Sequence, residues 1–252
     1  MGALSSNKLK AKNKFENIKS KYILLKIFDN LQKRRSLDII KYNKNMQNRL
    51  NININNFQEY VEIYSPIEIE IIPVQKNFGN LDIKIAEREE DQIRRFVNRR
   101  EGYGYYHIFF DDDKEEIGRD YLKFNENINK IKIIIDYQVK SFYELFANCD
   151  CIESIDFKKF YRNNITDMSY MFAQCRSLQK INLNNFNTEN VKYMVGMFVW
   201  CGQLNELNLK NFNINKVTNM VYMLVGCSEE LKKKIKERYK DISEKAFDTY
   251  TY

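Results

Sequence analysis

The chain has 252 residues, of which 44% are hydrophobic and 14% aromatic, so it can bury a core as one compound domain or as two small ones. Two prolines and eight glycines exclude a Pro-rich or Gly/Ser-rich linker, and no run of ~18 apolar residues predicts a membrane-spanning helix. The formal net charge is +7, and residues 1–35 carry ten Lys/Arg against two acidic residues, so only this end is expected to attract anions.

Residues 1–18 are a predicted flexible basic segment with a lipidation motif. The stretch Met1-Gly2-Ala-Leu-Ser-Ser6 fits the pattern for myristoylation of Gly2. One acyl chain binds membranes only reversibly until a basic patch adds to it, and such residues follow at Lys8, Lys10, Lys12 and Lys14. These features predict a cytoplasmic protein, peripheral on an anionic membrane face; the alternative is a plain basic tail. Secretion is not expected, because the N-terminus has no apolar segment with a cleavage site.

Residues 19–57 are predicted to form a helical hairpin. One apolar stripe follows helical spacing at Ile23, Ile27, Phe28 and Leu31, and a second at Leu37, Ile40, Met46 and Leu50. The string Ile23-Leu-Leu-Lys-Ile-Phe-Asp-Asn-Leu31 also resembles an F-box, which implies recruitment of a ubiquitin ligase. It lacks the leading Leu-Pro and the later tryptophan of that module. A plain hairpin therefore remains the alternative.

Residues 58–130 are predicted to form an irregular α/β cap. Strand periodicity appears at residues 67–72, 81–85 and 106–110, and another strand is predicted at 131–135, leading directly into the repeats that follow. The charged residues 87–100 are compatible with a helix. RNA binding is an alternative function, because arginines and tyrosines suited to stacking single-stranded RNA lie together at Arg94, Arg95, Arg99, Arg100, Tyr103, Tyr105 and Tyr106.

Residues 131–228 contain a repeat of 26 residues. The clearest markers are Cys149, Cys175, Cys201 and Cys227. Before each cysteine, apolar residues at spacings of three, six, seven and ten predict a short helix with one buried face. After it, alternation at pairs such as Ile155/Phe157 predicts a short strand. One such unit cannot bury both of its faces, so the repeats are expected to stack as a solenoid.

At about residues 131–231 the repeats resemble the BspA-type leucine-rich-repeat family. The matching segments are Ile165-Thr-Asp-Met-Ser-Tyr-Met-Phe-Ala-Gln-Cys-Arg-Ser-Leu and Phe186-Asn-Thr-Glu-Asn-Val-Lys-Tyr-Met-Val-Gly-Met-Phe. The resemblance implies an α/β fold: a short right-handed solenoid of about four repeats with parallel strands and short helices. The N-terminal cap and the C-terminal segment 229–252, an amphipathic helix over residues 229–246 followed by a tail, would close its ends.

A solenoid of this kind is expected to bind a protein partner on its concave face. The outward strand positions there are Ser154, Lys180 and Glu206; Asp156, Asn182 and Asn208; Lys158, Asn184 and Lys210. Trp200, the only tryptophan, is either a binding hot spot on the other side or a packing residue.

The chain has no recognisable catalytic motif. It has one histidine and lacks a G-x-S-x-G elbow, a P-loop and a G-x-G-x-x-G turn, so we expect neither an enzyme nor a cofactor. The repeated cysteines predict a row of buried free thiols in a reducing compartment, and no metal site. The favoured function is a non-enzymatic, intracellular protein-interaction module.

Overall fold

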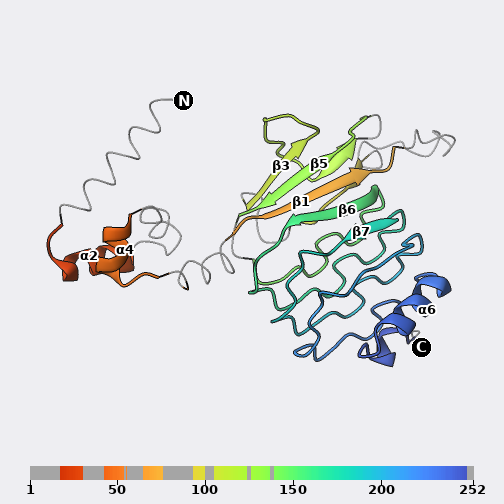
Figure 1. The fold of residues 1–252 in the computed structure, drawn as a ribbon. Coiled ribbons are helices and arrows are strands. Elements are labelled where there is room, and N and C mark those ends of the chain that lie inside the picture. Colours follow the sequence, from red (N-terminus) through yellow and green to blue (C-terminus); the bar gives the residue numbers. More distant parts are fainter. Residues whose placement is uncertain are drawn as a thin grey trace. The chain divides into compact units, whose positions relative to one another are not determined.

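The computed structural model describes residues 18–30, 43–53, 55, 65–75, 93–99, 105–123, 126–136 and 139–248 (Figure 1). The chain divides into two compact units, Met1–Tyr64 and Ser65–Tyr252. Two helices are described in the first unit, and the sheet and the repeats belong to the second. Within the described ranges, no helix has the length and apolar character needed to cross a membrane.

The smaller unit contains the helices α2 (Lys21–Asn30) and α4 (Lys44–Leu50), which lie in the predicted helical segment. Ile23 was expected on the buried stripe, but its side chain is exposed and the next residue is buried instead. The two helices share a small apolar core of Leu24, Phe28, Met46 and Leu50. The predicted stripe residues at 31, 37 and 40 lie outside the described residues.

The larger unit is built on a mixed five-stranded sheet in the order β3-β5-β1-β6-β7 (Figure 1). The antiparallel strands β1, β3 and β5 lie at three segments: Ile67–Pro73, Tyr106–Phe110 and Ile131–Ile135. They confirm the strands predicted there, whereas residues 81–85 lie outside the described residues. β6 (Ile152–Lys159) pairs antiparallel with β1 and parallel with β7 (Lys180–Asn182). Only β6 and β7 come from the repeats.

A second, two-stranded sheet corrects one expectation for the cap. The charged segment 87–100 was compatible with a helix, but its described part contains the strand β2 (Ile93–Arg95). This strand pairs antiparallel with β4 (Tyr121–Lys123). The residues just after β2, Phe96 and Val97, are fully buried, and this burial fixes the segment against the main core.

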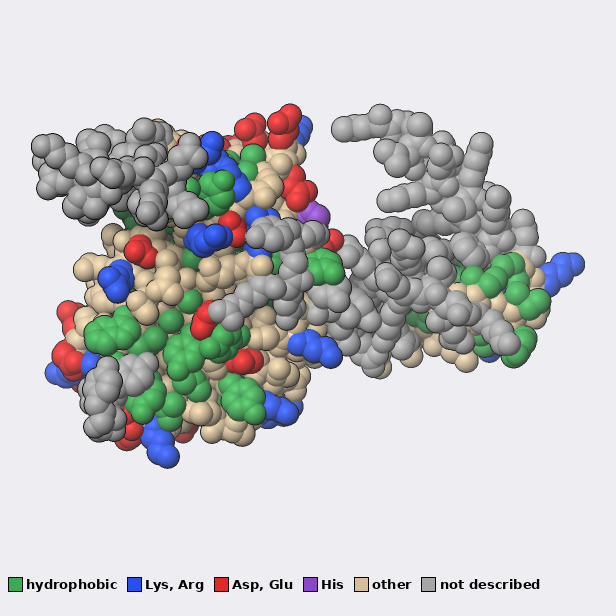
Figure 2. All heavy atoms as spheres, turned by 180° about the vertical axis from the view of Figure 1, so that it is seen from behind, with side chains coloured by type: hydrophobic (Ala, Val, Ile, Leu, Met, Phe, Trp, Pro, Cys, Tyr) green, Lys and Arg blue, Asp and Glu red, His purple; other side chains and the backbone are tan. Residues whose placement is uncertain are grey.

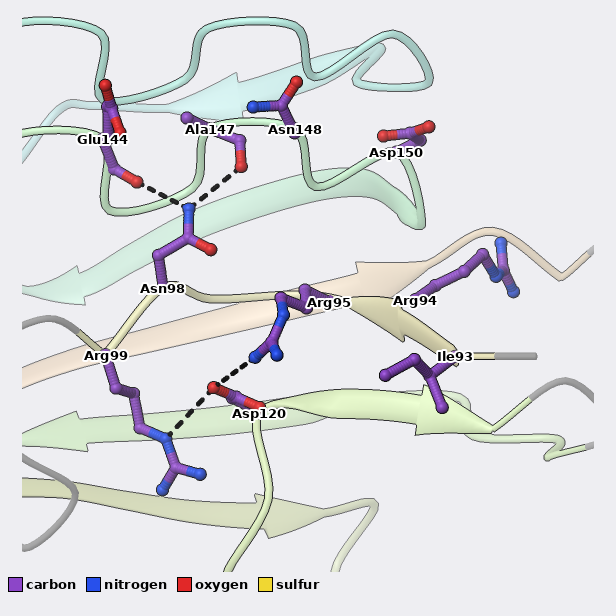
Figure 3. Close-up of a pocket in the computed structure, with 10 residues that line it drawn as sticks. All are labelled: Ile93, Arg94, Arg95, Asn98, Arg99, Asp120, Glu144, Ala147, Asn148 and Asp150. Carbon is purple, nitrogen blue, oxygen red and sulfur yellow. Dashed lines mark hydrogen bonds and ion pairs between the residues drawn. The ribbon is translucent and has the colours of Figure 1, made fainter. Parts of the chain in front are cut away.

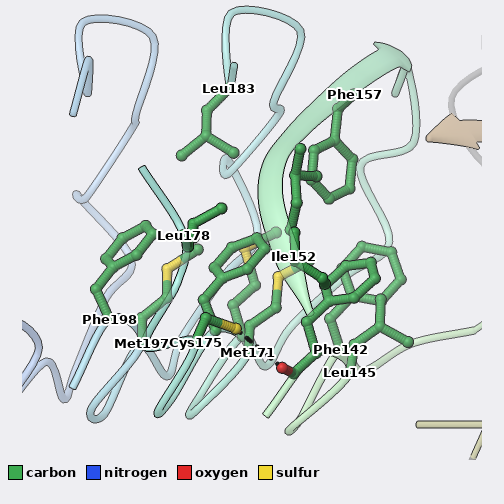
Figure 4. Close-up of a cluster of buried hydrophobic side chains, with 14 of the residues drawn as sticks. Phe142, Leu145, Ile152, Phe157, Met171, Cys175, Leu178, Leu183, Met197 and Phe198 are labelled. Carbon is green, nitrogen blue, oxygen red and sulfur yellow. Dashed lines mark hydrogen bonds between the residues drawn. The ribbon is translucent and has the colours of Figure 1, made fainter. Parts of the chain in front are cut away.

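The core lies between the five-stranded sheet and the repeats that follow it. Alternate residues of β1, β3 and β5 face inward and are buried, as period-two side-chain geometry requires. Repeat-related rings stack on one another: Phe146 on Phe172 at 5.6 Å between centroids and Phe172 on Phe198 at 5.3 Å. Figure 4 shows Phe198 and other buried side chains of the repeats in one cluster with Ile152 and Phe157 of β6. Truncation of such a ring to alanine costs ~3–5 kcal/mol of stability.

Each repeat contributes one layer of turns at residues 141–149, 167–175, 193–201 and 219–227, together called the turn stack. Within the first layer, N–H groups bond three residues back, as from Leu145 to the carbonyl oxygen of Phe142 at 3.1 Å. The intervening N–H groups bond to the next layer, as from Phe146 to the carbonyl oxygen of Met171 at 2.8 Å. The predicted repeat helices are therefore wrong, because a helix would direct every N–H four residues back.

The predicted leucine-rich-repeat solenoid of parallel strands and short helices is likewise wrong. The sheet is mixed, with three antiparallel pairings and one parallel pairing. Leu207 and Leu209 are buried as expected, but no strand is assigned to these described residues. Consecutive four-residue turns bury residues that are four positions apart, such as 142 and 146 or 145 and 149. One face of a helix buries residues at the same spacing. The apolar spacing therefore could not separate the two structures.

Segments from outside the turn stack close both of its ends. The N–H of Asn98 donates to the carbonyl oxygen of Leu145 in the first layer at 2.7 Å. In the last layer, the N–H of Leu224 donates to the carbonyl oxygen of Ala246 at 2.9 Å, within the 3-10 helix η3 (Glu244–Ala246). The single helix expected over 229–246 is shorter, because α6 covers Glu229–Arg238 only.

Candidate functional site

Two positions in every layer of the turn stack hold the left-handed backbone conformation. The first has φ between 53° and 60° and is occupied by Glu144, Tyr170, Gly196 and Tyr222. The second has φ between 57° and 73° and is occupied by Asn148, Gln174, Trp200 and Gly226. In the first three layers, both positions are the third residue of a hydrogen-bonded turn, where glycine is favoured. Residues other than glycine, asparagine and aspartate cost ~1–2 kcal/mol there, yet three of the eight residues are large aromatics.

These aromatic residues lie on an apolar row that is separate from the main core. Tyr170 and Tyr222 pack on its buried floor, and the ring of Tyr143 meets that of Tyr170 edge-on at 5.9 Å between centroids. The Trp200 ring lies over Gly226, where an added Cβ would lie 2.7 Å from Cδ2 of the indole. We call this surface the aromatic strip, and it comprises Tyr143, Ala147, Tyr170, Ala173, Val199, Trp200, Tyr222 and Val225.

The rings of the aromatic strip are accessible to solvent. Trp200 is 51% exposed and Tyr143 is 37% exposed. Figure 2 shows hydrophobic side chains, several with rings, gathered on one face of the larger unit. Of the two roles that the sequence left open for Trp200, packing is confirmed by its contact with Gly226. Its exposed apolar surface leaves the binding role a prediction.

The third layer has a second unusual aromatic residue, at the position where each layer begins. In the other layers this position holds Ser141, Asp167 and Asn219, whose side-chain oxygens accept a hydrogen bond from the N–H two residues later at 2.8–3.1 Å. Such bonds favour turn formation. The third layer has Tyr193 instead, 46% exposed, and a tyrosine cannot make this short-range bond.

The residues predicted to bind a partner on a concave face are brought together by the structure. Ser154 pairs with Lys180, and Asp156 with Asn182, in the parallel register of β6 and β7. In the following repeat, the side chain of Asn208 donates to that of Asn184 at 3.3 Å. The nine residues are half-buried or exposed. They form a polar ladder on the outer side of the sheet and of the repeat beyond it.

Many polar groups of this ladder already bond to one another. Asn182 Nδ2 donates to Asp156 Oδ1 at 2.9 Å, and Lys158 pairs with both Asp156 and Glu70. The Tyr239 hydroxyl donates to Asn208 Oδ1 at 3.0 Å. A partner would have to replace these bonds, which lowers the net gain from binding there.

A hollow of about 520 Å³ lies where β2 approaches the first layer of turns (Figure 3). The buried carboxylate of Asp120 accepts from Arg95 Nη1 at 2.9 Å and lies 3.6 Å from Arg99 Nε. Burial lowers the pKa of Arg94. The three arginines of the hollow are balanced by Asp120, Glu144 and Asp150. A balanced charge favours a structural role over the binding of an anion.

The described residues of the expected RNA-stacking surface do not all lie exposed together, although Tyr105 is half-buried and Arg95 is exposed. Arg94, Arg95 and Arg99 line the hollow described above, and the side chain of Tyr106 is buried in the core. Arg100 and Tyr103 lie outside the described residues. A base could not stack on the buried ring.

The buried free thiols predicted from the cysteine spacing are confirmed. All five cysteines are free and buried. The thiol of Cys175 donates to the carbonyl oxygen of Phe146 at 3.0 Å. The thiols of Cys201 and Cys227 donate in the same way to Phe172 and Phe198, each in the preceding layer. Burial raises the pKa of every one, to about 12 for Cys151 and Cys227. They are therefore neutral packing residues rather than nucleophiles.

Two further predictions concern the lipidation motif and a metal site. Gly2 and the basic residues Lys8, Lys10, Lys12 and Lys14 lie outside the described residues. Among the residues that are described, no group of three or more His, Cys, Asp or Glu side chains could hold a metal ion.

Residues 140–246 match the family described as "Mycoplasma protein of unknown function, DUF285". The chain is similar to that family over the turn stack and the segment that closes it. No curated protein and no solved structure matches the chain. Because no leucine-rich-repeat family model matches the chain, the predicted assignment to a leucine-rich-repeat family is wrong. The match also leaves out residues 20–50, so it gives the F-box resemblance no support.

Sequence reasoning singled out Trp200 but missed the tyrosines beside it. A signal was present, because Tyr143 and Tyr170 fall in the same turn segment of successive repeats. Only the turn geometry shows that Tyr170 packs on the buried apolar row and that the ring of Tyr143 meets that of Tyr170.

Proposed function

We propose that the larger unit is a non-enzymatic protein-binding module that binds its partner through the exposed aromatic residues of the turn stack. The observation that carries this proposal is the pair of exposed aromatics in the third layer, Tyr193 and Trp200. Both occupy positions where the local backbone favours a different kind of residue.

A large exposed aromatic residue at a position where the local backbone favours another residue type is typical of a functional surface. Trp200 holds φ at 62°, in the region that glycine prefers. Tyr193 stands where a short polar side chain would close the turn. Stability alone would favour glycine or asparagine in place of Trp200, and aspartate or asparagine in place of Tyr193. A binding role would account for the retention of both aromatic residues.

The chemistry of the surface suits a protein partner. Tyrosine and tryptophan are enriched at interface centres, because they bury a large apolar area at little cost in side-chain entropy. The layer-to-layer hydrogen bonds hold the backbone beneath them, so the rings need little reordering on binding. The polar ladder is less suitable, because its side chains already bond to one another.

The test is co-purification of tagged full-length protein from the cells that express it, with bound proteins quantified by mass spectrometry. Wild type is compared with Trp200→Ala, Tyr193→Ala and a control, Tyr161→Ala. Tyr161 lies outside the turn stack and is 51% exposed, the same as Trp200. Loss of one stoichiometric partner from the first two variants alone supports the proposal. Retention of all partners by both variants, or equal loss from the control, contradicts it.

The location of the module is a second part of the proposal. Five free, buried thiols suit a reducing compartment such as the cytoplasm, and the Met1-Gly2 motif with its following lysines suits reversible attachment to a membrane face. Substitution of Gly2 by alanine should move the protein from the membrane fraction to the soluble fraction, whereas Ala3→Ser should not. An unchanged distribution of the Gly2→Ala protein would remove the anchor from this proposal.

A further inference from the structure

A second hollow, of about 200 Å³, opens beside the last layers of the core. Three of its wall residues, Met194, Leu209 and Met223, belong to the buried core. Two others, Phe212 and Ile214, are only half-buried. The hollow is thus a place where the apolar interior reaches the surface, and it is separate from the aromatic strip.

The hollow lies where a ladder of stacked rings ends. Phe160 contacts Phe186 at 4.6 Å between centroids, and Phe186 stacks on Phe212 at 5.9 Å with an interplanar angle of 8°. The residue 26 positions after Phe212 is Arg238, which lies in the helix α6 rather than in a repeat. Its guanidinium lies over the ring of Tyr239, 5.5 Å from the centroid. Phe212 is therefore the last phenylalanine of the ladder, and it lines the hollow.

Positive charge predominates around the mouth of the hollow. Lys210, Arg238 and Lys240 line it together with one acidic residue, Asp241, and all four side chains are exposed. An apolar site with an excess of cations at its entrance suits a ligand with an apolar body and an anionic end. An uncharged apolar ligand would gain nothing from the entrance residues.

We infer that this hollow binds a small amphiphilic carboxylate. Its apolar part, an aromatic ring or a short chain of similar size, continues the ladder beyond Phe212, and its carboxylate lies among Arg238, Lys240 and Lys210. The volume of about 200 Å³ exceeds the ~150 Å³ of an apolar cavity that holds benzene, so a ring with a short substituent fits. The flexible side chains of Met194, Met220 and Met223 adjust to its shape.

The test is a titration of the full-length protein, labelled with ¹³C at its methionine methyl groups, with 3-phenylpropionate. The resonances of Met194, Met220 and Met223 report on the hollow, whereas Met46 and Met171 do not line it. We expect saturable shifts confined to the first three, and about threefold to tenfold weaker binding of the neutral 3-phenylpropanol. Absence of saturable shifts at millimolar ligand, or equal shifts of all the methionines, would overturn the inference.

Variants separate the two parts of the site. The double variant Arg238→Gln, Lys240→Gln should bind the acid only as tightly as the alcohol, while Lys216→Gln, an exposed lysine outside the hollow, should behave as wild type. Ile214→Trp should fill the hollow and abolish binding of both ligands. Unfolding of the tryptophan variant would be recognised from its methyl spectrum. In that case the double variant Arg238→Gln, Lys240→Gln would still test whether the hollow binds the carboxylate. Equal affinity of wild type for acid and alcohol would contradict the carboxylate assignment.

Discussion

The side chain of Asn98 donates a hydrogen bond to the carbonyl oxygen of Ala147 at 3.0 Å. One layer further on, the equivalent carbonyl, that of Ala173, accepts from the backbone N–H of Asn148 in the preceding layer at 2.8 Å. The Asn98 side-chain amide thus donates the hydrogen bond that the backbone N–H of a preceding layer would donate. The turn stack begins where Asn98 satisfies two carbonyl groups that a further repeat would have bonded, that of Leu145 with its backbone N–H and that of Ala147 with its side chain.

Replacement of Asn98 by alanine should destabilise the larger unit. The Asn98 amide also donates to the carbonyl oxygen of Glu144 at 2.8 Å, so the variant leaves two partly buried carbonyl groups without this donor. We expect a loss of about 1–3 kcal/mol in the free energy of unfolding, measured by urea denaturation. Asn127→Ala, at an exposed position, is the control. Equal stability of the two variants would mean that Asn98 does not close the stack.

Replacement of Tyr193 by aspartate should stabilise the protein and weaken partner binding. The aspartate would restore the short-range bond that Asp167 makes to the N–H of Ser169 at 2.8 Å. We expect a gain of about 0.5–1.5 kcal/mol, seen in the same denaturation experiment. The reverse change, Asp167→Tyr, should cost a similar amount. A Tyr193→Asp protein that is less stable than wild type would show that the tyrosine is a packing residue.

The five thiols should be protected as long as the protein is folded. Burial raises the pKa of each thiol, and so the reactive thiolate is scarce at neutral pH. A thiol-specific reagent should therefore label the native protein very slowly and all five cysteines once urea is added. Rapid labelling of any cysteine in the native state, identified by peptide mapping, would contradict the burial of that residue.

His107 should make stability weakly dependent on pH. Its pKa is raised, first by the hydrogen bond to Glu116 and then by the charges of Glu116 and Asp136, which lie 3.0 and 3.4 Å from its ring nitrogens. The folded state therefore holds the proton more tightly than the unfolded state. This contribution is fully present below the unfolded pKa of ~6.5 and is lost as pH rises through the higher folded pKa.

The effect of His107 can be isolated by comparison with His107→Gln. The difference in unfolding free energy between wild type and variant should be larger at about pH 5.5 than at about pH 8.5. It should remain small, because the side chain is partly exposed and solvent screens its charge pairs. A difference that is constant across this range, or that grows with pH, would contradict the raised pKa.

Several parts of the fold could be predicted from the sequence, because the relevant signal was local. Alternation of apolar residues located β1, β3 and β5, and the 26-residue spacing located the buried cysteines. The residues 142, 145, 146 and 149 were correctly identified as buried. What failed was the backbone that joins them, because consecutive turns and a helix bury the same positions.

The rest depended on pairings between distant segments. No periodicity indicates that β1, from outside the repeats, pairs antiparallel with β6, or that Asn98 closes the first layer. The candidate site depended on the same information. Tyr143 and Tyr170 meet only because layer-to-layer hydrogen bonds align residues about 26 positions apart. The sequence therefore predicted the residues of the polar ladder but not the aromatic strip.

The most direct test of the proposed function uses the fluorescence of Trp200, the only tryptophan in the chain. In the free protein, an indole that is 51% exposed should emit as a solvent-accessible group and be quenched readily by acrylamide. Addition of a tryptophan-free preparation of the partner identified by co-purification should shift the emission to shorter wavelength and protect it from acrylamide. An indole that is already shielded in the free protein, or whose emission and quenching do not change when the partner binds, would contradict the assignment of the binding surface to the aromatic strip.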